Sequence, residues 1–265
     1  MPAGSRIADA AVTADGRIHA WVIGAGDEPV RAYDPASHSW SLEAPAALPG
    51  PIPFEGELVD EWGYGDESEV AAGGDGLIYM TWGVAGPEFR LFAYDPATRR
   101  WERDAAVVFD EFVFDMASGT DGDIYLLTGS KVLRFDVDER RIEDAPEATA
   151  GFNSLAAAGN RVFAAFGGIG GTGDAAFYDA ARLTWSAPEE QPGMEFGGWA
   201  ADLDGWLYGV QIEPYSFLVV RDPAAGEWMA GAGPPAPLGS DVLVADGNLY
   251  VIGSGVQNAV FERKP

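Results

Sequence analysis

The sequence predicts an all-β protein, a six-bladed β-propeller with mostly four-stranded antiparallel blades. Three observations predict it: one pattern of apolar strand and turn is written six times, the copies follow a period of about 44 residues, and each copy has room for four short strands. The chain has 265 residues and 47% hydrophobic side chains. This is enough for one large core, so we expect residues 1–265 to form a single domain.

Each copy opens with a turn and an apolar strand that carries an aromatic side chain at a fixed place. The stretches DGRIHAWVIG at 15–24 and DGLIYMTWG at 75–83 are two examples. An Asp-Gly dipeptide before such a strand is typical of a tight hairpin. The aromatic positions are spaced 60, 46, 38, 45 and 42 residues apart and are His19, Tyr79, Tyr125, Phe163, Tyr208 and Tyr250.

A second strand of each copy ends in an aspartate, and a large apolar residue follows six positions later. The aspartate is suited to cap its own turn, and a following proline sets the first turn dihedral. We expect the Trp side chains of this pattern to be largely buried between neighbouring blades. The pairs are Asp34 and Trp40, Asp95 and Trp101, Asp136 and Ile142, Asp179 and Trp185, and Asp222 and Trp228.

Three segments make this pattern specific: YDPASHSW at 33–40, YDPATRRW at 94–101 and RDPAAGEW at 221–228. The whole pattern resembles the kelch repeat. It consists of an aromatic strand, a glycine, Tyr-Asp-Pro, and a Trp six positions after the Asp. The resemblance covers nearly the whole chain. It implies that the chain is similar to stand-alone, acidic kelch proteins of the bacterial or archaeal type. It implies a kelch-like propeller, and protein interaction is the commonest role of that family. The double glycine that follows the aromatic strand in the family is usually reduced to one here and is kept only at Gly167-Gly168.

The repeat register also sets the expected blade boundaries. The sixth copy ends after its third strand, so we expect either a three-stranded blade or a brief pairing of the terminal residues. An insertion at 47–66 separates the first two blades. The blades are expected at about 5–46, 67–107, 113–146, 151–190, 196–234 and 238–265.

Charge and composition exclude several classes of function. The formal net charge of −26 argues against nucleic acid or an anionic membrane as a partner, and fits either a cationic partner or a solubility adaptation. With no cysteine and two histidines, thiol chemistry, Ser-His-Asp catalysis and multi-histidine metal sites are excluded. No signal-peptide or membrane-spanning segment is evident, so we expect a cytoplasmic protein.

One column of the repeat, six residues before the Asp-Gly turn, carries carboxylates in three successive blades. We expect Asp9, Glu69 and Asp115 at the mouth of the central channel, as catalytic general acid and base candidates. Carboxylates packed together need a cation, a shared proton or arginine partners, so the same three are the ligands if a divalent Ca or Mg ion is present. The alternative is that strand alternation points some of them between blades, toward backbone amides.

Candidate substrate-binding residues surround the same channel mouth. We expect residues 50–66 to form a lid over Glu69 and Asp115, because insertions of this length are often functional. The alternatives are a solvated acidic loop and ordinary packing of aromatics between blades. The candidates are Trp62, Tyr64, Glu67, Phe114, Asn153, Phe196, Trp199, Tyr215 and Ser240.

These residues favour a small-molecule-binding propeller, either without catalysis or as a cofactor-independent isomerase, cyclase or lyase that uses carboxylate acid–base chemistry. No organic cofactor is expected. The alternative from the kelch resemblance is a protein–protein interaction module without catalytic activity, whose acidic face would select a basic protein partner. A third hypothesis is a purely structural propeller.

Overall fold

The computed structural model describes most of the chain. The described residues are 6–23, 30–42, 53–54, 57–58, 69–83, 89–109, 112–119, 121–128, 131–144, 154–158, 161–165, 173–191, 196–202, 204–211, 217–232, 241–252 and 259–262.

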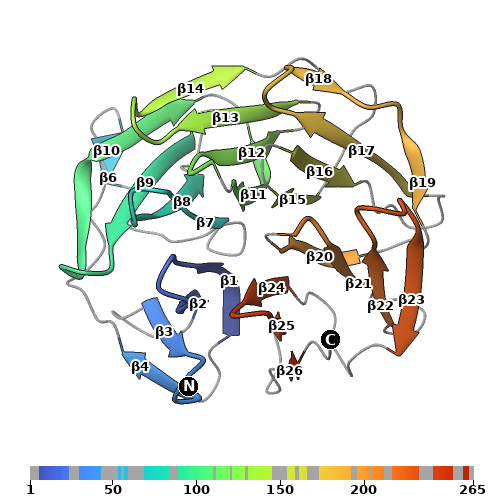
Figure 1. Ribbon diagram of the computed structural model, residues 1–265. Helices are drawn as coiled ribbons and strands as arrows, with labels where there is room; N and C mark the ends of the chain where they lie inside the picture. Colours follow the sequence, from blue (N-terminus) through green and yellow to red (C-terminus); the bar gives the residue numbers. More distant parts are fainter. Residues whose placement is uncertain are drawn as a thin grey trace.

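The prediction of an all-β antiparallel propeller is confirmed. The described residues form strands and turns, with no helix among them, and all paired strands are antiparallel. In these residues there is accordingly no apolar helix of membrane-spanning length. Figure 1 shows the sheets arranged around a central space, with one strand of each sheet facing that space.

Five sheets contain four or more strands and correspond to five complete blades. Within each sheet the chain runs outward from the innermost strand, and the first four strands pair with their neighbours in sequence. The first sheet contains β1 (Arg6–Val12), β2 (Ile18–Ile23), β3 (Val30–Asp34) and β4 (Ser39–Leu42), and the second contains β7 (Val70–Ala72), β8 (Ile78–Gly83), β9 (Phe89–Asp95) and β10 (Arg100–Phe109).

The next three sheets follow the same order. The third contains β11 (Val113–Ser118), β12 (Ile124–Thr128), β13 (Val132–Asp136) and β14 (Arg141–Asp144). The fourth contains β15 (Ser154–Ala158), β16 (Arg161–Ala165), β17 (Gly173–Asp179), β18 (Thr184–Trp185) and β19 (Glu189–Gln191). In this sheet both β18 and β19 pair with β17. The fifth contains β20 (Phe196–Ala201), β21 (Leu207–Gln211), β22 (Phe217–Arg221) and β23 (Trp228–Ala232).

The sixth copy of the repeat forms a smaller sheet. It has three strands among the described residues, β24 (Asp241–Ala245), β25 (Asn248–Ile252) and β26 (Ala259–Glu262). Among the described residues, five complete blades are therefore present rather than six. In the insertion between the first two sheets, β5 (Pro53–Phe54) and β6 (Glu57–Leu58) form a separate hairpin.

The innermost strands close into a ring. Each contacts the innermost strand of the next sheet, in the order β1, β7, β11, β15, β20 and β24, and β24 contacts β1 again. A backbone bond also joins the turns of two neighbouring sheets, where the Gly74 amide donates to the Gly122 carbonyl at 2.8 Å. At that contact a Cβ on Gly74 would lie 2.6 Å from the Gly122 Cα, so only glycine fits.

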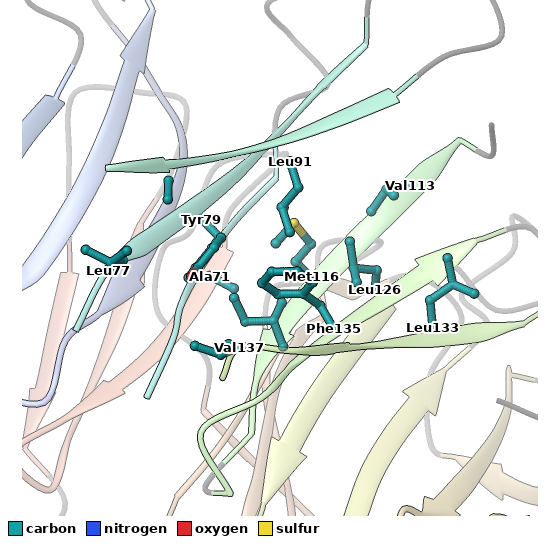
Figure 2. Close-up of a cluster of buried hydrophobic side chains, with 12 residues drawn as sticks. Ala71, Leu77, Tyr79, Leu91, Val113, Met116, Leu126, Leu133, Phe135 and Val137 are labelled. Carbon is teal, nitrogen blue, oxygen red and sulfur yellow. The ribbon is translucent and has the colours of Figure 1, made fainter. Parts of the chain in front are cut away.

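The hydrophobic core is divided among the boundaries between sheets. Figure 2 shows one boundary, where Ala71 and Tyr79 of the second sheet face Met116 and Phe135 of the third. The rings of Tyr79 and Phe135 meet edge-on with centroids 5.1 Å apart, and both side chains are fully buried. Similar clusters occupy the other five boundaries. Packing between adjacent sheets therefore holds the ring together.

The four Trp residues of the repeat lie at these boundaries and, as predicted, are largely buried there, each with a smaller exposed part. Trp101, for example, packs against Trp21 of the first sheet and Tyr94 of its own, with ring centroids 6.3 and 5.3 Å apart. These Trp residues lie at or next to the first residue of the outer strands. Trp40, Trp185 and Trp228 occupy equivalent places.

The turn before each of these outer strands has the capping predicted from the sequence. Asp95 accepts bonds from the Ala97 amide at 2.8 Å and the Thr98 hydroxyl at 2.6 Å. The residue four positions after each aspartate has a left-handed backbone, which glycine adopts without strain and other residues rarely do. These residues are His38, Arg99, Arg140, Leu183 and Gly226, with φ between 51° and 69°.

Candidate functional site

A cavity of about 750 Å³ occupies the centre of the ring. Residues from the innermost strands of all six sheets line it, together with the turns that follow five of those strands. The wall is made mainly of small side chains, among them Ala11, Ala72, Ala157 and Ala201. Because short side chains leave the centre open, the sequence pattern of alanine-rich inner strands creates the space.

All the charged side chains among the described lining residues are aspartates. Neither Lys, Arg nor His occurs among them. The six aspartates are Asp9, Asp15, Asp115, Asp202, Asp204 and Asp246.

Asp9 and Asp115 lie at the end of the cavity where the inner strands begin, and their carboxylates reach across to the next sheet. Asp115 Oδ2 accepts bonds from the Leu155 amide at 2.6 Å and the Ser154 hydroxyl at 3.0 Å, and Oδ1 accepts from the Met116 amide at 2.7 Å. Asp9 binds the Val70 amide in the same way, with Oδ1 on the Ala10 amide at 2.6 Å.

Both carboxylates therefore point between sheets, toward backbone amides, which is the alternative to a place in the channel mouth. Their catalytic role stays a prediction, and the structure gives both a second role in joining neighbouring sheets. A β-bulge precedes each aspartate, with Ala8 and Phe114 as the extra residues. A bulge re-aims the side chain that follows it, which explains the sideways direction.

Glu69 is differently placed. Its backbone pairs with Thr81, whose amide donates to the Glu69 carbonyl at 3.0 Å, and its own amide donates to the Thr81 hydroxyl at 3.2 Å. It is not among the residues that line the cavity. Among the described residues there is no group of three or more His, Asp or Glu side chains placed to hold a metal ion. Asp9, Glu69 and Asp115 are thus not brought together as a cation site.

The opposite end of the cavity is formed by the hairpin turns, and the sequence reasoning missed it. Asp15, Asp202, Asp204 and Asp246 line this end. The sequence signal for this end is the repeated Asp-Gly dipeptide, which by itself indicates only a hairpin. Asp246 and Gly247 form a two-residue hairpin with φ of 48° and 73°, typical of a type I′ turn.

Aspartates of the turns also anchor the aromatic column of the repeat. The Tyr79 hydroxyl donates to Asp75 at 2.8 Å, and the Tyr125 hydroxyl donates to Asp121 at 2.7 Å. Burial, together with these bonds to carboxylates, raises the pKa of both tyrosines far above the ordinary value. The aspartate at the equivalent turn of the first sheet bonds elsewhere: the Thr13 hydroxyl lowers the pKa of Asp15.

The remaining predicted binding residues fall into three groups. Trp199 lines the cavity and is 5% exposed, with its ring packed against Phe163 and Trp228. Phe114 is exposed beside Asp115, and Phe196 begins β20. The others lie outside the described residues, as does most of the predicted lid at 50–66: Trp62, Tyr64, Glu67, Asn153, Tyr215 and Ser240.

Comparison with solved structures supports the fold. No protein-family model matches the chain, and no curated protein sequence matches it. Among the solved structures that resemble it is a gluconolactonase from Xanthomonas campestris, with a TM-score of 0.62 and 12% sequence identity. The match covers 97% of this chain and 85% of that one. At this identity the similarity shows that the chain is a β-propeller of the architecture used by that enzyme.

Proposed function

We propose that the protein is a small-molecule-binding propeller whose ligand occupies the central cavity. The observation that carries the proposal is the cavity of about 750 Å³, walled by small side chains and bordered by aspartates at both ends. Ligand sites commonly have volumes of roughly 300–1,000 Å³, with mostly apolar walls and a few polar groups. The cavity has both properties.

The ligand is neutral or cationic in this proposal. Six aspartates and no basic side chain are found among the described residues of the wall. A phosphate or carboxylate in the cavity would meet uncompensated like charge at low dielectric, which is strongly unfavourable. The formal net charge of −26 also repels anionic ligands over longer distances.

If the protein is an enzyme, we propose carboxylate acid–base chemistry without an organic cofactor, of the isomerase, cyclase or lyase type. Asp9 and Asp115 remain the candidates, because both line the cavity and a carboxylate can act as a general acid or base. The gluconolactonase with the same fold adds hydrolysis of a lactone, an uncharged substrate, to the reactions worth testing. A bound Ca or Mg ion and a cytoplasmic location stay predictions.

We also propose that the three-stranded sheet counts as a sixth blade, as the kelch-like repeat predicts. The support is the ring of inner strands, in which β24 lies between β20 and β1 as each other inner strand lies between its neighbours.

The test blocks the cavity and measures binding. Ala157 is half-buried on the cavity wall, so Ala157→Phe should fill part of the space, whereas Ala230→Phe adds the same group to the exposed outer strand β23. Thermal shift against neutral, cationic and anionic metabolites, with a gluconolactone hydrolysis assay beside it, measures the effect.

We expect a neutral or cationic compound to raise the unfolding midpoint of the wild type and Ala230→Phe, and not of Ala157→Phe. Preferential stabilisation by anionic compounds, or full binding to a folded Ala157→Phe variant, would contradict the proposal.

A further inference from the structure

One exposed aromatic side chain directly precedes a residue that lines the strand-start end of the cavity, although it is not itself among the lining residues. Phe114 is 44% exposed, and its ring meets that of Phe112 edge-on with centroids 4.7 Å apart. It directly precedes Asp115, which lines the cavity. Because 44% of Phe114 stays exposed, this side chain contributes less to folding than a phenylalanine in the core would.

The bulge in β11 does not explain the phenylalanine. Three inner strands have a bulge at the equivalent place, between Ile7 and Asp9, between Val113 and Asp115, and between Phe196 and Gly198. The extra residue is Ala8 in the first, Phe114 in the second and Gly197 in the third. In the first of these, an alanine precedes an aspartate that makes the same bond to the next sheet. The fold therefore accepts a small residue at this place, and the aromatic ring at 114 needs another reason.

We infer that Phe114 is a ligand-contacting residue at the strand-start mouth of the cavity, where it stacks on the ring or apolar face of a ligand without negative charge. This inference rests on the proposed function and adds the mouth that the ligand uses and the chemistry it presents. An exposed aromatic face gives affinity for flat or apolar groups, and the neighbouring Asp115 excludes anions.

Two fluorescent dyes of the same ring system provide the test. Phenylnaphthylamine is uncharged, and anilinonaphthalene sulfonate is its anionic relative. We expect the uncharged dye to bind the wild-type protein with enhanced fluorescence and the sulfonate to bind much more weakly. Phe114→Ala should raise the dissociation constant of the uncharged dye about fivefold, the effect of losing one aromatic contact.

The matched control is Met229→Ala, which removes another exposed apolar side chain, 46% exposed on the outer strand β23. It should leave dye binding unchanged. Phe114→Ala reproduces the residue that the first sheet already has, so its unfolding midpoint should match that of the wild type.

The outcomes separate the inference from the proposed function. If Phe114→Ala binds the uncharged dye as the wild type does while Ala157→Phe loses binding, the cavity holds ligand and the inference about Phe114 is wrong. If the dye also binds a folded Ala157→Phe variant fully, the proposed function fails for this ligand class. If the wild type binds neither dye but binds a lysine-rich peptide through Phe114, the surface serves a protein partner and the inference is overturned.

Discussion

Asp115 Oδ2 accepts a hydrogen bond from the Leu155 amide at 2.6 Å, across the boundary between the third and fourth sheets. The same oxygen accepts from the Ser154 hydroxyl, so one side chain satisfies two donors of the neighbouring sheet. The residue predicted as a catalytic carboxylate is therefore also a link between sheets. Stability measurements separate the two roles.

Replacing Asp115 by Ala should lower the free energy of unfolding by about 1–3 kcal/mol, because the Leu155 amide loses its acceptor at a partly buried place. Asp115→Asn keeps an acceptor oxygen and should cost less. Urea denaturation of both variants measures the difference. A loss below about 0.5 kcal/mol for the alanine variant would show that the link is dispensable. Intact stability with lost turnover in the asparagine variant would favour the catalytic role.

Truncating Trp101 should weaken the boundary between the first two sheets. Trp101→Ala removes contacts with Trp21 and Tyr94 and should lower the free energy of unfolding by about 2–4 kcal/mol, less than full burial would give. Chemical denaturation with unchanged circular dichroism of the folded state is the measurement. A decrease in the free energy of unfolding of less than about 1 kcal/mol would mean that the Trp101 ring contributes little to packing between the sheets.

Leu183 is a place where substitution should stabilise the protein. It is 57% exposed with φ of 54°, a strained conformation for a side chain with a Cβ. Leu183→Gly should raise the free energy of unfolding by about 1 kcal/mol. The reciprocal change at the equivalent turn, Gly226→Leu, should lower it by a similar amount. If both variants and the wild type have equal free energies of unfolding in urea titrations, the backbone at Leu183 is not strained.

Alkaline pH should destabilise the fold through Tyr79 and Tyr125. Their pKa values are raised in the folded protein, so the unfolded chain loses these protons first, near its ordinary value of about 10. The free energy of unfolding should therefore be constant with respect to these groups below about pH 10 and fall above it.

Tyr125→Phe removes one of these ionisable groups and should make the alkaline decline shallower. The fourth sheet already has a phenylalanine, Phe163, in this column, so the substitution keeps a shape that the fold accepts. Urea titrations at a series of pH values measure the slope. An identical slope in the variant and the wild type would contradict the assignment.

The sequence predicted the parts of this structure that repeat in every copy. The Asp-to-Trp spacing predicted the capped turn, and Asp95 makes the predicted bonds. These features depend on residues close together in the chain, and local hydrogen bonding determines them.

The direction of the candidate carboxylates could not be predicted in the same way. Asp9 and Asp115 follow β-bulges, and one extra residue shifts the alternation of a strand, so the column did not show which way they point. The aspartates of the Asp-Gly turns can be identified in the sequence. Their location at one end of a common cavity follows only from the closed ring of inner strands.

The ring closure has a mechanical consequence. Since β1 and β24 lie side by side, the first and last described strands of the ring meet at a single seam. A stretching force applied to the two ends of the chain would load that seam before any complete sheet. Extension should then proceed by peeling successive sheets from both sides of the opening, with the sheet opposite the seam the last to yield.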